Sequence, residues 1–183
     1  QAGSPTEVQQ VGDDFTITGG ESSADGQALF HAFEQLGVSS GQIATFLAQP
    51  EVQSILGGVV GGEASYIDGL VRVVGSSADL YLMNPAGILF GPNAHLDLAG
   101  SFAATTASGV LFDEAIFNVL GNDDFSQLTG PPTGFVFAID EAGAIVNAAD
   151  LTVAPGESIS LIGGQVVSTG TLTAPGGDIT IAA

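Results

Sequence analysis

The sequence contains no cysteine, no lysine and no tryptophan, and its only basic side chain apart from two histidines is Arg72. Without cysteine the chain has neither a disulfide framework nor a thiolate metal site. One arginine stands against twenty Asp and Glu residues, which gives a formal net charge of −19. No cationic surface is therefore available to neutralise phosphates, which excludes nucleic-acid binding and disfavours docking on anionic lipid head groups. The charge favours a soluble exported chain; the alternative is a partner with a basic groove.

Long apolar runs are missing too, so the sequence predicts no transmembrane helix and no insertion into a membrane. The first residues show neither the basic region nor the apolar core of a signal peptide. We therefore expect a mature or trimmed form of an exported protein. Only 11% of the residues are charged, 45% are hydrophobic and 27 are glycine. This composition is typical of many short strands joined by tight turns, and 183 residues suit one domain spanning 1–183.

The stretch 78–108 organises the chain. Apolar residues alternate with polar ones around two turn signals, Asn84-Pro85-Ala86-Gly87 and Gly91-Pro92-Asn93. In a type I turn, Asn84 would cap with its side chain, Pro85 would pre-set φ and Gly87 would release the chain. The pattern predicts strand, turn, strand, turn, strand, with a third strand carrying Leu96, Leu98 and Phe102.

The last thirty residues contain a repeat. Residues 155–161 and 175–181 align at an offset of 20, with apolar positions 159 and 161 matching 179 and 181. In a strand-rich sequence such a period predicts a solenoid in which neighbouring units bury a shared face. We therefore predict an all-β fold, a right-handed parallel β-helix with an N-terminal cap and extra-helical strand or hairpin excursions. The last strand would present an open edge, and we expect this chain to be the N-terminal part of a longer repeat protein.

Two segments allow more than one interpretation. The stretch 27–38 has apolar residues at near-helical spacing, but its strand-like surroundings favour extended structure. Between 110 and 132 the pattern loosens, which predicts an excursion from the stack, such as a hairpin with a long loop. His31 is more simply a buried core histidine than a metal ligand, since His95 is the only other histidine. The pair Asp13-Asp14 is expected to be solvated, and we expect no metal site and no cofactor.

The turn at Asn84-Pro85-Ala86-Gly87, the following Gly-Pro-Asn-Ala corner and the segment Ile67-Asp68-Gly69 resemble the secretion domain of two-partner secretion exoproteins, the filamentous haemagglutinin N-terminal family. The resemblance implies a secretion-targeting domain of a large adhesin-like protein. It implies recognition by POTRA domains of a partner outer-membrane β-barrel transporter, passage through the periplasm and folding at the cell surface. The chain lacks the second Asn-Pro turn of the haemagglutinin branch, which weakens transfer of individual residue roles.

The expected recognition residues are Asn84, Pro85, Ala86 and Gly87, with Asn93 second. A corner that only shapes the fold is an equally good interpretation of the same residues. We expect a monomer and no enzymatic activity, because a β-helical polysaccharide lyase or hydrolase needs clustered carboxylates with basic partners, and Arg72 stands alone. An adhesive, carbohydrate-binding module and a structural surface β-helix without transporter recognition are the competing interpretations of the same fold.

Overall fold

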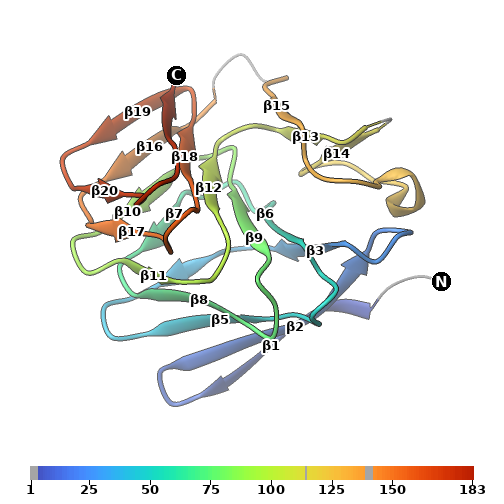
Figure 1. Cartoon of the computed structure of the whole chain (residues 1–183), viewed down its shortest axis with the longest axis horizontal. Coiled ribbons are helices and arrows are strands. Elements are labelled where there is room, and N and C mark those ends of the chain that lie inside the picture. Colours follow the sequence, from blue (N-terminus) through green and yellow to red (C-terminus); the bar gives the residue numbers. More distant parts are fainter. Residues whose placement is uncertain (1–3, 114, 139–141) are drawn as a thin grey trace.

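In the computed structural model, short strands form a parallel β-helix with three faces. The structure describes residues 4–113, 115–138 and 142–183. Successive coils contribute one strand to face A, one to face B and one to face C in turn, except that the last coil contributes strands to faces A and B alone (Figure 1). Face A contains β2 (Asp14–Ser22), β5 (Ile43–Leu47), β8 (Leu70–Val74), β11 (His95–Asp97), β17 (Leu151–Thr152) and β20 (Leu172–Thr173). Face B contains β3 (Ala28–Phe33), β6 (Ser54–Val59), β9 (Asp79–Met83), β12 (Phe102–Thr105), β18 (Ile159–Ile162) and β21 (Ile179–Ala182). Face C contains β4 (Gly37–Val38), β7 (Ser65–Ile67), β10 (Ile88–Phe90), β16 (Ala144–Asn147) and β19 (Gln165–Ser168).

Strands of successive coils lie parallel and in register, which confirms the predicted all-β parallel β-helix. Ile159 pairs with Ile179 and Leu161 with Ile181, as the offset of 20 predicts. One coil earlier, Phe102 pairs with Ile159, a step of 57 residues, because an extra-helical segment is inserted between β12 and β16. Inward side chains stack on their partners, so a single apolar core runs through the described coils, with Phe46, Phe90 and Phe102 among its largest members.

The predicted N-terminal cap of the β-helix is a hairpin. Strand β1 (Ser4–Val11) pairs antiparallel with β2, which in turn pairs parallel with β5. The stretch 27–38 is extended: it forms β3 and β4, with Leu29 and Phe33 facing the core. Its near-helical spacing arises because β3 is buried on both sides, with Ala28 and Phe30 facing outward into a second core.

That second core lies beneath the predicted excursion. Strands β13 (Gly109–Leu111), β14 (Ile116–Asn118) and β15 (Gly134–Val136), with the 3₁₀ helix η1 (Phe125–Gln127), form an antiparallel sheet in the order β14-β13-β15. This extra-helical sheet lies beside the start of face B in Figure 1. The outer surfaces of β3, β6 and β9 are buried by apolar residues of this sheet and of its connections, namely Val110, Phe112, Phe117, Val119 and Leu128. The predicted hairpin with a loop is therefore a three-stranded sheet.

Corners divide two stretches of alternating sequence. Residues 66–74 form the end of β7 and all of β8, with Asp68-Gly69 between them. The predicted strand over Leu96 to Phe102 is wrong in extent: β11 ends at Asp97 and β12 begins at Phe102. A Cβ on Gly100 would lie 2.4 Å from the Ala78 carbonyl oxygen, so this corner requires glycine for close approach to the preceding coil.

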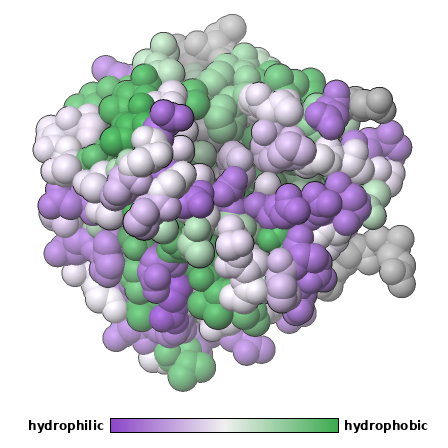
Figure 2. Space-filling view, in the orientation of Figure 1, coloured by the Kyte–Doolittle hydropathy of each residue, from purple (hydrophilic) through white to green (hydrophobic). Residues whose placement is uncertain are grey.

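The surface is mixed in character. Figure 2 shows hydrophilic residues crossing the middle of one face, between hydrophobic patches. Large hydrophobic side chains are exposed in part at scattered positions, including Tyr66, Leu89 and Val167 on the outer side of face C. No helix among the described residues is long and apolar enough to cross a membrane.

Candidate functional site

The turn Asn84-Pro85-Ala86-Gly87 forms the corner between face B and face C, where β9 ends and β10 begins. The Gly87 backbone N–H donates to the Asn84 carbonyl oxygen at 3.0 Å and closes the turn. The Ala86 N–H donates to Asn84 Oδ1 at 3.0 Å, so the predicted side-chain cap is present. Gly87 has φ +128°, a region that favours glycine.

Asn84 also ties this corner to the coils on either side. Its Nδ2 donates to the Glu63 carbonyl oxygen at 2.8 Å and to Ser65 Oγ at 3.0 Å in the preceding coil. Its backbone N–H donates to the Thr105 carbonyl oxygen at 3.0 Å in the following coil. The residue is 1% exposed, and both polar side-chain atoms have partners. In the folded domain, Asn84 acts as a buried clamp between three coils.

The neighbouring motif residues differ in what they present to solvent. Pro85 and Gly87 are buried, and only Ala86 is exposed. The Pro85 carbonyl oxygen accepts from the Gly143 N–H at 2.9 Å, which adds another link to the following coil. In the folded domain, the motif therefore exposes to a partner little more than the methyl group of Ala86.

Asn93 lies at the opposite end of β10, at the corner between face C and face A. Its backbone N–H donates to Asp68 Oδ1 at 2.9 Å, and its Nδ2 lies 3.3 and 3.2 Å from the two Asp68 carboxylate oxygens. Asp68 is 8% exposed, whereas Asn93 itself is exposed. The His95 ring donates from Nδ1 to the Asn93 carbonyl oxygen at 2.8 Å. Asn84 and Asn93 thus belong to two separate corners with different partners.

A third asparagine holds another corner in the way that Asn84 does, and sequence reasoning missed it. Asn147 is 0% exposed and ends β16. Its Nδ2 donates to the Ala149 carbonyl oxygen and to Ser168 Oγ, each at 3.1 Å, and its Oδ1 accepts from the Ala149 N–H at 3.1 Å. The sequence after it, Ala148-Ala149-Asp150, has no proline or glycine to mark a turn. The signal that could have predicted this corner is the asparagine itself, which ends the apolar strand sequence Ala144-Ile145-Val146.

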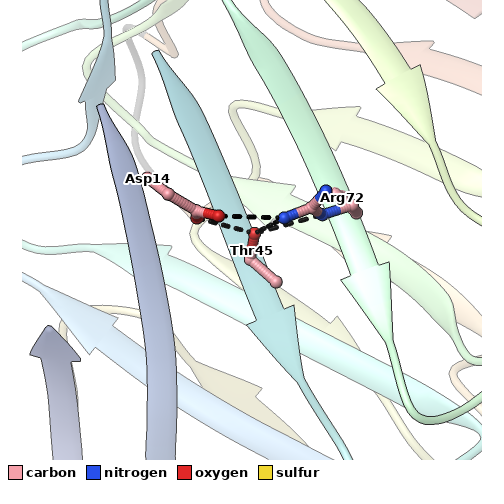
Figure 3. Close-up of polar contacts among 3 residues, drawn as sticks. All are labelled: Asp14, Thr45 and Arg72. Atoms are coloured by element: carbon pink, nitrogen blue, oxygen red, sulfur yellow. Dashed lines mark hydrogen bonds and ion pairs between the residues drawn. The ribbon is translucent and has the colours of Figure 1, made fainter. Parts of the chain in front are cut away.

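The single arginine is engaged within the domain. Arg72 lies on the outer side of face A, where its Nη2 is 3.0 Å from Asp14 Oδ2 and 3.0 Å from Thr45 Oγ1 (Figure 3). Thr45 Oγ1 donates to Asp14 Oδ1 at 3.0 Å. Arg72 is thus partly exposed and paired with a carboxylate. The expectation that Asp14 is merely solvated is wrong, because stacking of β2, β5 and β8 brings it to Arg72.

His31 is a buried core residue, as expected. It is 1% exposed, its Nδ1 lies 3.2 Å from Thr6 Oγ1, and its Nε2 has no hydrogen-bond partner in the part of the chain that the structure describes. Burial lowers the pKa of His31 from 6.5 to about 4, so the ring is neutral near pH 7. Among the described residues, no group of three or more His, Cys, Asp or Glu side chains is placed to hold a metal ion.

Comparison with known proteins gives one family and a consistent fold. The family model "TPS secretion domain" matches residues 1–183. The structure is similar to that of the HMW1 secretion domain from Haemophilus influenzae, with a TM-score of 0.72 and 24% identity, over 98% of this chain and 42% of that one. It is also similar to the filamentous hemagglutinin secretion domain, with a TM-score of 0.53 and 15% identity over 100% of both chains. No curated protein matches the chain.

Proposed function

The chain belongs to the TPS secretion domain family, and from that premise we propose that it brings a large adhesin-like exoprotein to the POTRA domains of a partner outer-membrane β-barrel transporter. Membership of the family means a secretion-targeting role in two-partner secretion, and with it an exported protein and a transporter partner. The chain spans about two fifths of the HMW1 structure that it matches, so the activity of a whole exoprotein is a separate matter. The observation that carries the proposal is the family match over all 183 residues.

We propose that recognition precedes folding. In the folded domain the side-chain amide of Asn84 is hydrogen-bonded to Glu63, Ser65 and Ala86, so little of the motif is accessible to a partner. In an extended chain the same residues are accessible, and an alternating apolar strand can add to the open sheet edge of a partner domain. After transit, the corner hydrogen bonds would form at the cell surface.

Folding outside the cell is the second half of the proposal. A solenoid gains stability by adding each coil to the one before it, so a capped first segment can nucleate the coils that follow. The hairpin β1–β2 and the extra-helical sheet cover the early coils, which supports nucleation at this end. We expect a secreted, cell-surface monomer with no cofactor and no catalytic turnover.

The test is secretion of the domain into the medium, with and without its partner barrel. Appearance that requires the barrel supports the proposal. Release without the barrel would contradict the proposal and favour an adhesive module or a structural surface β-helix.

Point variants then separate recognition from folding. Asn84→Ala and Asn147→Ala each remove three hydrogen bonds of a buried asparagine side chain, but only Asn84 belongs to the Asn-Pro-Ala-Gly motif. If the transporter reads the motif, Asn84→Ala lowers secretion well below Asn147→Ala at matched stability. Equal secretion by the two variants would leave the motif with a folding role alone.

A further inference from the structure

A groove lies where the extra-helical sheet leaves face B. It has a volume of about 310 Å³, near the lower end of the range of small-molecule pockets. Its floor is the outer side of β12 and β18, where the small side chains of Ala103 and Ser160 leave space. Its walls are Asp79 and Tyr81 from β9 and Thr133 to Phe135 at β15. Figure 1 shows β15 beside the upper coils, on the side of face B.

Negative charge is concentrated at one end of this groove. Asp79 is partly buried, and its Oδ1 accepts from the Ser101 N–H at 2.8 Å. The Ser101 hydroxyl donates to Glu157 Oε2 at 2.8 Å, so one serine bridges two carboxylates. Burial, with a smaller contribution from the charge of Glu157, raises the pKa of Asp79 from its usual value. Both effects disfavour the ionised form of Asp79, and a cation beside the carboxylate would oppose them.

No residue that the structure describes supplies such a cation to the groove. It has no lysine, and its one arginine is on face A, paired with Asp14. A positively charged ligand from outside would neutralise Asp79 and relieve its repulsion by Glu157.

Aromatic side chains form the adjoining wall. The rings of Tyr81 and Phe135 have their centroids 6.4 Å apart and lie at 53° to each other. Burial, together with the nearby charge of Asp79, raises the pKa of Tyr81 to about 12, so its hydroxyl stays protonated. A planar guanidinium can stack on an aromatic ring while it donates hydrogen bonds to a carboxylate, which a lysine ammonium does less well.

Above the groove, β15 is an edge strand. Among the described strands it pairs with β13 alone, and Thr133 to Phe135 also line the groove. An extended peptide can add to such an edge through its backbone, while a side chain enters the neighbouring cavity. The edge and the cavity together suit a strand that carries one basic residue.

We propose that this groove of the folded domain binds an arginine side chain on an extended segment of a protein partner, with Asp79 as the carboxylate that pairs with the guanidinium. This site acts in the folded domain, so it is independent of recognition during export. Tyr81 and Phe135 provide the stacking wall, and β15 the backbone contact.

The probe is a capped seven-residue peptide, Thr-Val-Thr-Arg-Thr-Val-Thr, titrated by calorimetry against the whole chain. The matched peptide carries citrulline, which keeps the shape of arginine without its charge. We expect the arginine peptide to bind at least about tenfold more tightly, because a charge-assisted pair is lost with citrulline. Equal affinity of the two peptides, or no binding of the arginine peptide at millimolar concentration, would overturn the proposal.

Two variants locate the site. Asp79→Asn removes the charge and keeps an oxygen that can accept from the Ser101 N–H, so the fold is preserved; we expect affinity to fall about tenfold or more. Ser160→Phe fills the floor of the groove without changing charge and should abolish binding. If Asp79→Asn fails to fold, as judged by thermal melting, Ser160→Phe alone decides, and retained binding in it refutes the site.

Asp13→Asn is the control for bulk attraction by a chain of net charge −19, because Asp13 is exposed in the turn between β1 and β2. It removes the same charge away from the groove and should change affinity less than about twofold. A loss as large as that of Asp79→Asn would mean that the peptide binds the general negative field, and the proposal would fail.

Discussion

Strand β6, near the N-terminal end of the β-helix, has every residue buried, whereas β21 in the last coil has every residue exposed. Both strands belong to face B and carry inward isoleucines: Ile55 is 0% exposed and Ile179 is 47% exposed. The early coils are covered three times, by the next coil, by the hairpin β1–β2 and by the extra-helical sheet. Because each coil of a solenoid is stabilised by its neighbours, stability should be concentrated in the early coils.

The largest effect should come from removing a core side chain at the covered end. Phe46 is 1% exposed, and its ring meets those of Phe33 and His31. Phe46→Ala should lower the free energy of unfolding by about 3–5 kcal/mol, through lost burial and the cavity that is left. Ile181→Ala, at a residue 53% exposed, should cost less than about 0.5 kcal/mol. Urea denaturation of both variants measures the difference; equal losses would contradict the gradient.

Asn84 and Asn147 are buried asparagines that hold corners in an earlier and a later coil, so the same substitution can be compared at the two places. Asn84→Ala leaves the Ala86 N–H and the Glu63 carbonyl oxygen without their side-chain partner, and should cost about 2–3 kcal/mol. Asn147→Ala, which removes two bonds to Ala149 and one to Ser168, should cost about as much by the same reasoning. Denaturant titration of the two variants tests this. A much smaller loss for Asn147→Ala would show that later coils relax around a broken corner.

The buried histidine makes the covered end sensitive to acid. The folded-state pKa of His31 is about 4, below the unfolded value of 6.5, so the unfolded chain binds more protons between these values. Its contribution to stability is complete above about pH 6.5 and is lost as the pH falls towards about 4. The free energy of unfolding should therefore drop by about 2 kcal/mol from pH 7.5 to pH 5 on account of this residue.

Glu21 lines the cavity beside His31, so the control must isolate the ring. His31→Gln fills similar space with a side chain that does not titrate. Its stability should change less between the two pH values than that of the unmodified chain. Parallel pH profiles for both proteins would place the acid sensitivity in the carboxylates instead.

The difference between the early and the last coils also explains how much of the fold the sequence could predict. The turn at Asn84 was predictable because proline and glycine mark it locally, and the offset of 20 was visible because nothing interrupts the last two coils. The earlier steps are irregular: Asp79 and Ser101, in neighbouring coils, are 22 residues apart, and Ser101 and Ser158 are 57 apart. The inserted extra-helical sheet conceals the repeat there.

Contacts that depend on stacking left no local signal. Asp14 and Arg72 are 58 residues apart and meet only because three strands of face A lie in register. Asn147 carries no proline or glycine after it, so its corner was not identified. The groove between β15 and face B likewise arises from the path of the excursion, which periodicity does not encode.

The smallest effect should come from the ion pair on the outer side of face A, at the covered end. Arg72 and Asp14 have side chains 30% and 37% exposed, so water and salt screen their attraction, and a double-mutant cycle of Arg72→Met and Asp14→Asn should give a coupling below about 1 kcal/mol. The coupling should shrink further in about 1 M salt, where the screening length is about 3 Å.

Arg72 is nevertheless the only Lys or Arg in a chain of charge −19. Arg72→Met alone should therefore cost more than the pair coupling at low salt, because repulsion among the remaining carboxylates increases. A loss confined to the Asp14 coupling would show that the early coils are held by packing alone.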